Sequence, residues 1–397
     1  MSRSPFIVSL RFVTSTLGEL FGRRGSEEEA ELTVEVDGAY GEGGGQILRV
    51  SLALSALTSI PVHLRNIRVK RSPSGLRAQH RTAVEAVAQL SNATVKGLEL
   101  GSTELKFIPG QLRGGRLILD TGTAGSTTLV LQSLLPAMLF CEGRVDVEVR
   151  GGTNNPLAPA IDYLQRVFTP TLSLMGLDAK IELVRRGFYP RGGGIVRAGL
   201  DPVKTIQAIK LERFDKASDI NGIAYSSRLP SHIVSRMVKS VQEILQHARF
   251  GVGRIDSEIV QQGDPRCALS PGCGILLTTK VLPLGVLGAD SLGALGKSAE
   301  KVGEEAAKAS LQLIEEKVPV DPHLADQLII YMALAKGNSR IRVSELTPHT
   351  ESCIHVCEYF FGRLFTVTKE TSNLTSIACN GAAFAASERG ARRSRLP

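Results

Sequence analysis

The sequence has no tryptophan, and aromatic residues make up only 5% of its 397 residues. Its core must therefore be built mainly from aliphatic side chains. It also has no apolar run of the roughly 18–20 residues that a membrane-spanning helix needs. Apolar stretches such as SLLPAMLF and LIIYMALA have the length of core helices. We therefore expect a globular protein that has no membrane partner.

Cysteine is also sparse, and most of the net positive charge lies at the two ends of the chain. Six cysteines in a long chain without a secretory signal predict free thiols in a reducing compartment rather than a disulfide framework. The formal charge is +8, but residues 1–24 and the last eleven residues each carry +3. Only +2 is left for the rest, so net charge alone is a weak argument for nucleic-acid binding.

Both ends differ in composition from the middle of the chain. Residues up to 24 are rich in Arg, Ser and Thr, and the acidic stretch SEEEAE follows. We expect residues 1–31 to be an unstructured extension; a mitochondrial transit peptide is the alternative. A basic tail is expected over residues 381–397.

The order strand, helix, strand, helix recurs about three times between these ends, with a period of roughly 70–80 residues. This period is too long, and its copies too few, for a solenoid. The pattern predicts an α/β (α+β) fold whose large core contains about three to four repeated βαβα units. Between about residues 205 and 295 the order of strand-like and helix-like segments changes, which predicts a small inserted α/β domain. The core is then expected over 32–204 and 296–380, with a helix over 300–316 returning to it.

The glycine-rich stretch GEGGGQILR lies between a predicted strand and a buried helix, at residues 41–49. It is neither a Walker loop nor a dinucleotide fingerprint. Glycines let the backbone approach a ligand, and a helix N-terminus offers free N–H groups to an anion. A tight strand–helix turn is the alternative. Glu42 is a candidate metal ligand if phosphates bind here, and Arg49 needs a partner because its helix is otherwise apolar.

Three further segments carry candidate chemistry. The stretch IRVKRSPSGLRAQHR (67–81) contains no acid, and strand alternation would put Arg68 and Lys70 on one face. It predicts an anion site, with a solvated basic edge as the alternative. His349 lies at the start of a predicted helix, and a structural role is its simplest explanation. Asp326 and Gln327 lie near the start of another helix, where capping is the simplest role for Asp326.

Eight motifs follow one another in a fixed order from about residue 34 to residue 370. They read DGAYGEGGGQILR, IRVKRSPSGLRAQH, ELGSTELKFIPG, TAGSTTLVLQ, GGTNNPLAP, RGFYPRGGG, HLADQLIIYMALA and HTESCIH. Together they resemble the RNA 3′-terminal phosphate cyclase family. The resemblance is weakest in the insert and absent at both ends. It implies a core of repeated βαβα units that carries a small inserted domain.

The resemblance also implies a reaction and its partners: ATP, Mg²⁺ or Mn²⁺, and an RNA with a 3′-phosphate end. In this family a histidine attacks the α-phosphate of ATP, diphosphate leaves, and AMP stays on the imidazole. AMP then passes to the RNA, which gives an RNA(3′)pp(5′)A intermediate. The neighbouring 2′-OH finally expels AMP and closes a 2′,3′-cyclic phosphate. Imidazole suits this task because it is nucleophilic at neutral pH and leaves readily once adenylylated.

Site residues carry over from the family by motif. His349 matches the adenylylated histidine, and Glu42 matches the metal-binding glutamate beside the triphosphate. The resemblance assigns the RNA terminal phosphate to Arg49, Arg68, Arg71 and Gln79. It assigns the adenosine pocket to Gln132, Pro159, Asp326 and Gln327. His323 stands where the family often has a tyrosine that stacks near adenine, which leaves the preference between ATP and GTP open.

Three other functions stay open at this point. A non-catalytic, cyclase-like protein of pre-rRNA processing would lack the nucleophile motif, which this chain retains. An enolpyruvyl-transferase-like enzyme would share a repeated α/β architecture but have no use for ATP. A plain RNA-binding protein would have no catalytic step. Nuclear residence is the family expectation for eukaryotic members, with mitochondrial and cytoplasmic residence as alternatives, and the oligomeric state stays open.

Overall fold

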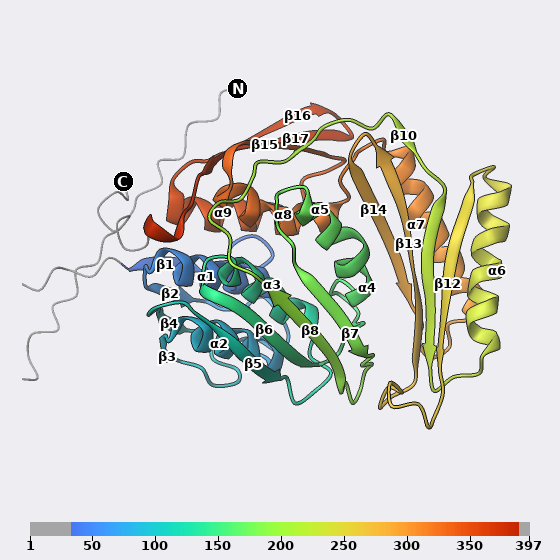
Figure 1. Ribbon diagram of the computed structural model, residues 1–397, viewed down its shortest axis with the longest axis horizontal. Helices are drawn as coiled ribbons and strands as arrows, with labels where there is room; N and C mark the ends of the chain where they lie inside the picture. Colours follow the sequence, from blue (N-terminus) through green and yellow to red (C-terminus); the bar gives the residue numbers. More distant parts are fainter. Residues whose placement is uncertain (1–32, 389–397) are drawn as a thin grey trace, which may run out of the picture.

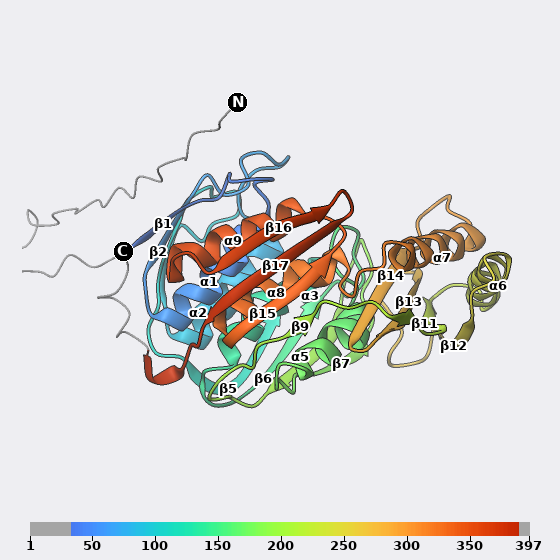
Figure 2. The ribbon, with the colours of Figure 1, turned by 90° about the horizontal axis from the view of Figure 1, so that it is seen from above.

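Three four-stranded sheets surround a central group of helices, and a five-stranded sheet lies beside them (Figures 1 and 2). The computed structural model describes residues 33–388. The predicted extension over 1–31 and the end of the predicted basic tail lie outside these residues. The repeated mixed architecture confirms the predicted α/β (α+β) class. In the described part of the chain, no helix is both long enough and apolar enough to cross a membrane.

The first unit forms a sheet of order β1-β2-β4-β3. Its elements are β1 (Val34–Asp37), α1 (Gly45–Thr58), β2 (Val62–Arg65), α2 (Ala78–Ser91), β3 (Thr94–Lys96) and β4 (Leu105–Ile108). β1 and β2 pair in parallel, so α1 crosses over between them. Every residue of α1 from Ile47 to Thr58 is buried, as its nearly all-apolar sequence predicts.

The second unit repeats this order, with a sheet of order β5-β6-β8-β7. Its strands are β5 (Arg113–Asp120), β6 (Glu142–Gly151), β7 (Lys180–Arg185) and β8 (Gly194–Leu200). Its helices are α3 (Thr127–Met138), α4 (Ile161–Tyr163), the π-helix η1 (Leu164–Phe168) and α5 (Thr169–Ser173). β5 and β6 again pair in parallel around α3.

The third unit is interrupted after its first strand. β9 (Lys210–Leu211) pairs in parallel with β15, just as β1 pairs with β2. The remaining elements are α8 (Pro322–Leu334), β15 (Lys336–Val343), α9 (Pro348–Phe361), β16 (Phe365–Thr371) and β17 (Leu374–Ala382). The insert therefore stands between the first strand and the first helix of this unit, and the core has three units.

The insert contains β10 (Lys216–Ala217), β11 (Ile220–Ser227), α6 (His232–His247), β12 (Val252–Val260), β13 (Gly272–Leu282), β14 (Gly285–Leu292) and α7 (Ala299–Glu315). The limits predicted for it differ from this packing at both ends. Predicted insert residues 210 and 211 pair with the core strand β15. The helix expected to return to the core packs on α6 instead, because Val302 and Ala306 join Val234, Met237 and Val241 in a separate apolar cluster.

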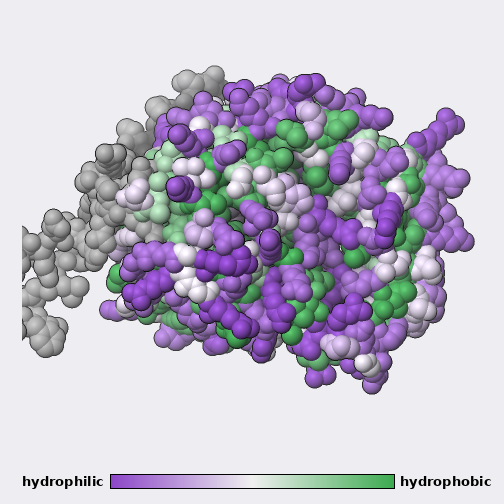
Figure 3. Space-filling view, in the orientation of Figure 1, coloured by the Kyte–Doolittle hydropathy of each residue, from purple (hydrophilic) through white to green (hydrophobic). Residues whose placement is uncertain are grey.

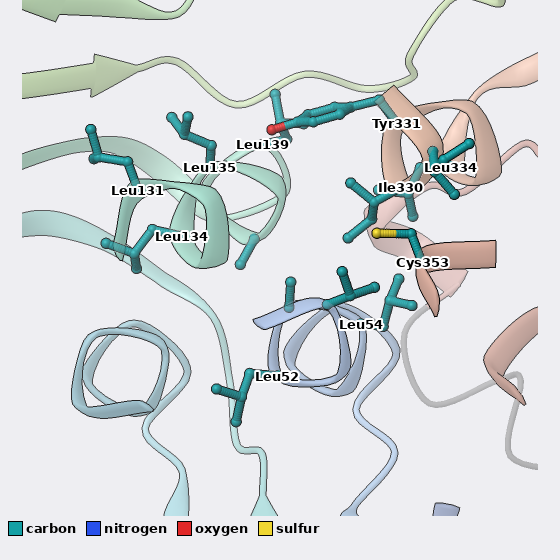
Figure 4. Close-up of a cluster of buried hydrophobic side chains, with 14 of the residues drawn as sticks. Leu52, Leu54, Leu131, Leu134, Leu135, Leu139, Ile330, Tyr331, Leu334 and Cys353 are labelled. Atoms are coloured by element: carbon teal, nitrogen blue, oxygen red, sulfur yellow. The ribbon is translucent and has the colours of Figure 1, made fainter. Parts of the chain in front are cut away.

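Helices with apolar buried faces fill the space between the three core sheets. α1, α3, α8 and α9 meet there, and Figure 4 shows Leu54, Leu134, Leu334 and Cys353 among the side chains of this buried cluster. This aliphatic core is what the scarcity of aromatic residues predicts. On the outer face shown in Figure 3, polar side chains dominate and apolar ones form small scattered patches.

The predicted basic tail begins too early at residue 381. β17 extends to Ala382, and a short 3-10 helix follows at Ala386–Glu388. Phe384 is fully buried, with its ring 4.9 Å from that of Phe140 in an edge-on arrangement. This aromatic contact fixes the end of β17 to the core, so residues up to 384 belong to the folded domain.

Arg186 joins the core to the insert through a buried charge network. Its guanidinium contacts Asp162 of the core at 2.7 Å and Glu258 of β12 at 3.0 Å. It also lies 3.7 Å from the ring centre of Tyr225 on β11. Burial alone would raise the pKa of Asp162, but the charge and hydrogen bonds of Arg186 hold that pKa below its ordinary value. Arg186 therefore stabilises the ionised form of the buried Asp162 carboxylate.

Replacing Arg186 by alanine should lower the free energy of unfolding by about 3–5 kcal/mol, because it leaves the Asp162 charge buried and unpaired. Urea denaturation followed by circular dichroism measures this change. The double variant Arg186→Met with Asp162→Leu should recover part of the loss. Arg213→Ala, which removes an exposed pair with Asp215, is the control and should leave the midpoint unchanged. A wild-type midpoint for Arg186→Ala would contradict the role given to this network.

Candidate active site

Helix N-termini from all three core units gather at one place. Gln79 of α2 accepts a hydrogen bond from the backbone of Ser126, the N-cap of α3, at 3.0 Å. Asp326 of α8 accepts hydrogen bonds from Thr347 and Thr350 at the start of α9. The N-caps and first turns of α1, α2 and α3 carry no acidic residue. Their positive dipole ends are therefore not neutralised, which favours anionic ligands.

The glycine loop between β1 and α1 needs its glycines for conformation and for close approach. Gly43 has a φ of 60°, in the left-handed region that side chains disfavour. A side chain at Gly45 would meet the ring of His80 at 2.4 Å. Gly44, the N-cap of α1, offers no side-chain oxygen to the free N–H groups behind it. These amides therefore face the site without a competing cap.

His349, Glu42 and Arg71 meet beside this loop. Arg71 Nη2 lies 2.8 Å from Glu42 Oε2, and His349 Nε2 lies 3.5 Å from the same oxygen. All three side chains are between about a third and a half exposed, at 35–45%. A ring nitrogen, a cation and a carboxylate are thus presented together to an incoming ligand. The three residues come from segments that are far apart in the sequence.

Hydroxyl groups fix the start of α9 and with it the histidine. Thr347 is the N-cap and accepts a hydrogen bond from the backbone of Thr350 at 2.9 Å. Both hydroxyls donate to Asp326 Oδ1 at 2.6 Å. Burial raises the pKa of Asp326 above its ordinary value, although these donors and His349 act in the opposite direction. Asp326 therefore ties α8 to α9, while Asp321 is the residue that caps α8.

Each core unit sends one polar side chain from the second turn of its first helix into a shared narrow pocket. These residues are Arg49 on α1, Gln132 on α3 and Gln327 on α8, and Asp326 lines the same pocket. Arg49 Nε, Gln132 Oε1 and Gln327 Oε1 are all buried without a hydrogen-bond partner within residues 33–388. Buried polar atoms normally have partners, so these three atoms are available to a polar ligand or to a buried water.

Sequence reasoning missed the immediate surroundings of Arg49. Its Nη2 donates to Gln46 Oε1, and Gln46 in turn contacts Cys353 of α9 at 2.9 Å. Burial lowers the pKa of Arg49 to about 10, so it stays charged at neutral pH. Burial, helped by the charge of Arg49, lowers the pKa of His80 to about 3, which keeps that ring neutral. The spacing of Gln46 and Arg49, one helical turn apart, was the available signal.

The basic stretch is a turn rather than the predicted strand. β2 ends at Arg65, and Arg68 has a left-handed φ of 54°. Arg68 Nη1 donates to the carbonyls of Pro73 and Gly75, at 3.1 and 2.7 Å. Its guanidinium closes the loop that carries Arg71. The prediction that Arg68 and Lys70 lie on one face of a strand is therefore wrong. Lys70 donates instead to the Gly41 carbonyl of the glycine loop, at 3.1 Å.

The two predicted residues not yet described are Pro159 and His323. Pro159 accepts a hydrogen bond from Thr128 of α3 at 2.8 Å. The exposed His323 ring lies edge-on to Tyr163, with centres 6.3 Å apart. Seven of the eleven predicted residues fall into two groups. His349, Glu42 and Arg71 form one group at the loop surface, and Arg49, Gln132, Asp326 and Gln327 form the other in the pocket.

Glu42 is the residue that can be tested as a metal ligand. Within residues 33–388, no three His, Cys, Asp or Glu side chains are grouped closely enough to hold a metal by themselves. Mg²⁺ commonly uses one or two carboxylates and takes its other ligands from substrate phosphates and water. A single accessible glutamate at the glycine loop fits that requirement. Arg71 would then have to give up its contact with the Glu42 carboxylate.

Comparisons with known proteins agree with this geometry. The family model described as RNA 3′-terminal phosphate cyclase matches residues 40–367. A protein of that name from Methanothermobacter thermautotrophicus is 46% identical over 87% of this chain and 99% of its own. One from Pyrobaculum aerophilum is 42% identical over 87% of this chain and 97% of its own. One from Ignicoccus hospitalis is 44% identical over 83% of this chain and 93% of its own.

The matched segment includes every residue brought together at the site, from Glu42 to His349. Both the family match and the identity to these relatives extend across the core and the insert. The chain therefore belongs to the RNA 3′-terminal phosphate cyclase family.

Proposed function

We propose that this protein is an RNA 3′-terminal phosphate cyclase that uses ATP and works through a covalent adenylate on His349. The observation that carries the proposal is the position of His349 Nε2, beside Glu42 and Arg71 and next to the N-cap of α1, whose first turn carries no acid. A nucleophile placed in such a positive field is suited to attack a phosphate. The names of the relatives support the same activity.

In the proposed first step, Nε2 of neutral His349 attacks the α-phosphorus of ATP, and diphosphate leaves. Asp326 acts indirectly, because it fixes the two threonines that set the start of α9. The unpartnered atoms of Gln132 and Gln327 would take polar groups of the nucleotide, and Arg49, which the family resemblance assigns to the RNA terminal phosphate, lines the same pocket. A divalent metal held by Glu42 would offset the negative charge of the triphosphate.

In the proposed second and third steps, an oxygen of the RNA 3′-phosphate attacks the adenylate, and the P–N bond to His349 breaks. The ribose 2′-OH then attacks the activated terminal phosphorus, and AMP leaves with its bonding pair. Arg71 is the cation placed to hold the RNA phosphate, because it is accessible and adjoins His349 through Glu42. A single site therefore handles two phosphate-bearing substrates in turn.

His349→Ala should abolish the transfer of label from ATP labelled at the α-phosphate to the protein, because it removes the proposed nucleophile. Acid-labile, protein-bound label measured after removal of free ATP checks this. His247→Ala, which removes an exposed histidine of α6 in the insert, is the control and should label normally. Retention of the label in His349→Ala would sink the assignment. A wild-type protein that never labels would favour the non-catalytic alternative.

Glu42→Gln should raise the Mg²⁺ concentration needed for half-maximal labelling at least about tenfold, since even outer-shell changes at metal sites cost about 10–100-fold. A metal titration of the labelling rate measures this shift. Saturating metal should restore part of the rate, because His349 remains intact. An unchanged metal requirement would show that Glu42 acts only through its contact with Arg71.

Arg71→Ala should leave labelling by ATP nearly unchanged but slow the transfer of AMP to RNA by about 10–100-fold. That range follows from the roughly 1.5–3 kcal/mol of a charged hydrogen bond. Single-turnover transfer from prelabelled protein to a 3′-phosphorylated RNA measures the step. Arg65→Ala, an exposed arginine at the end of β2, is the matched control and should transfer normally. Loss of labelling in Arg71→Ala would move this residue to the ATP side of the site.

A further inference from the structure

The turn over residues 188–192, between β7 and β8, buries one aromatic side chain and exposes the next. Phe188 is only 5% exposed and packs against Tyr225 of the insert, with ring centres 6.3 Å apart. Tyr189 is 77% exposed. A large ring held in solvent by a buried neighbour is unusual, because aromatic residues gain most stability by burial.

Hydrogen bonds on both sides fix this turn. Gly192 N donates to the Phe188 carbonyl at 2.8 Å, which closes the turn. Arg191 N donates to Ser270 Oγ of the insert at 3.2 Å. Gly187 N donates to Thr153 Oγ1 at 3.0 Å on the core side. The exposed Tyr189 ring is thus carried by an anchored segment, so little ordering is needed when it binds a partner.

A short series of contacts connects the turn to the active site. Gly192 packs so closely on the Thr123 carbonyl that an added side-chain carbon would lie 2.3 Å from it. The loop 121–126 that contains Thr123 continues to Ser126, whose backbone donates to Gln79. Gln79 lies in the same basic stretch as Arg71. The turn is therefore one loop away from the proposed phosphate site.

A second exposed apolar side chain lies on the neighbouring loop 152–160. Leu157 is fully exposed and has a left-handed φ of 63°, which is uncommon for a residue other than glycine. The amide of Asn155 holds this loop to the Ala124 carbonyl of loop 121–126, at 2.5 Å. Residues in such conformations cluster at ligand sites, where the surrounding structure maintains them.

The loops at this edge are strongly biased in charge. Residues 38–44, 66–77, 121–126, 152–160 and 187–193 contain one acid, Glu42, which is paired with Arg71. The same loops contain five cations: Arg68, Lys70, Arg71, Arg77 and Arg191. Exposed aromatic and apolar surface beside a basic edge is the combination that binds single-stranded nucleic acid.

We propose that Tyr189, with Arg191 beside it and Leu157 on the adjoining loop, forms a stacking platform for the nucleotides that precede the RNA 3′ end. This inference rests on the proposed function and extends that site to the body of the RNA strand. Stacking on Tyr189 accepts any base, because every base has a π face. Arg191 serves the backbone phosphates. The platform therefore gives affinity for RNA without sequence preference and takes no part in the chemistry.

The test compares a dinucleotide and a decanucleotide, each with a 3′-phosphate, as substrates of the full chain. Tyr189→Ala should raise KM for the decanucleotide about tenfold, in line with the loss of one base–aromatic stack. KM for the dinucleotide, kcat for both substrates and labelling by ATP should stay unchanged. Tyr189→Phe keeps the stacking surface and should behave as wild type. Leu284→Ala, at an exposed apolar residue in the β13–β14 hairpin of the insert, is the matched control.

Two outcomes would overturn the platform. An unchanged KM for the decanucleotide in Tyr189→Ala removes RNA as its ligand and leaves a protein partner as the occupant of this surface. An equal rise in KM for both substrates assigns Tyr189 to the reacting end instead. Failure of the proposed function is distinguishable, because the wild-type chain would then neither label with AMP nor cyclise either substrate.

Discussion

One carboxylate oxygen of Glu42 holds together the two groups on which the proposed chemistry depends. Arg71 lies 2.8 Å from this oxygen and His349 Nε2 lies 3.5 Å from it. The contact places a nucleophile and a phosphate-binding cation side by side before any substrate arrives. In the proposed reaction, a metal held by Glu42 would compete with Arg71 for the same carboxylate. Arg71 would then be available to the RNA phosphate.

The threefold repetition of the core explains why these groups can meet. Each unit begins with a strand, a loop and a buried helix, and α1, α3 and α8 pack together in the centre. Their second turns supply Arg49, Gln132 and Gln327 to one pocket, and all three side chains carry an unpartnered polar atom. Repetition thus directs three helix N-termini to one region, and those of α1 and α3, which carry no acidic residue, favour phosphates. The insert joins the core at the same edge through Arg186.

Local patterns predicted the repeated units, the glycine loop and the start of α9, because strand and helix periodicities and helix caps depend on residues that are close in the sequence. The family motifs then placed His349, Glu42 and Arg71 in one site, and the structure brings them together. The conformation of Arg68 escaped prediction, because its left-handed backbone and its hydrogen bonds to loop carbonyls depend on the folded turn. α7 was misplaced because an amphipathic pattern reveals a buried face but not which neighbour covers it. Likewise, the partners of Asp326 come from α9, more than twenty residues further along the chain.

A single-turnover chase tests the central claim most directly. Protein prelabelled with AMP on His349 is freed of ATP and mixed with an RNA that ends in a 3′-phosphate. The account predicts that label leaves the protein as free AMP, through a transient RNA-linked adenylate, while the RNA end becomes a phosphatase-resistant cyclic phosphate in equal amount. An RNA with a 2′-deoxy terminal sugar should stop at the adenylate. Label that stays on the protein, or is released without cyclised RNA, would contradict the account.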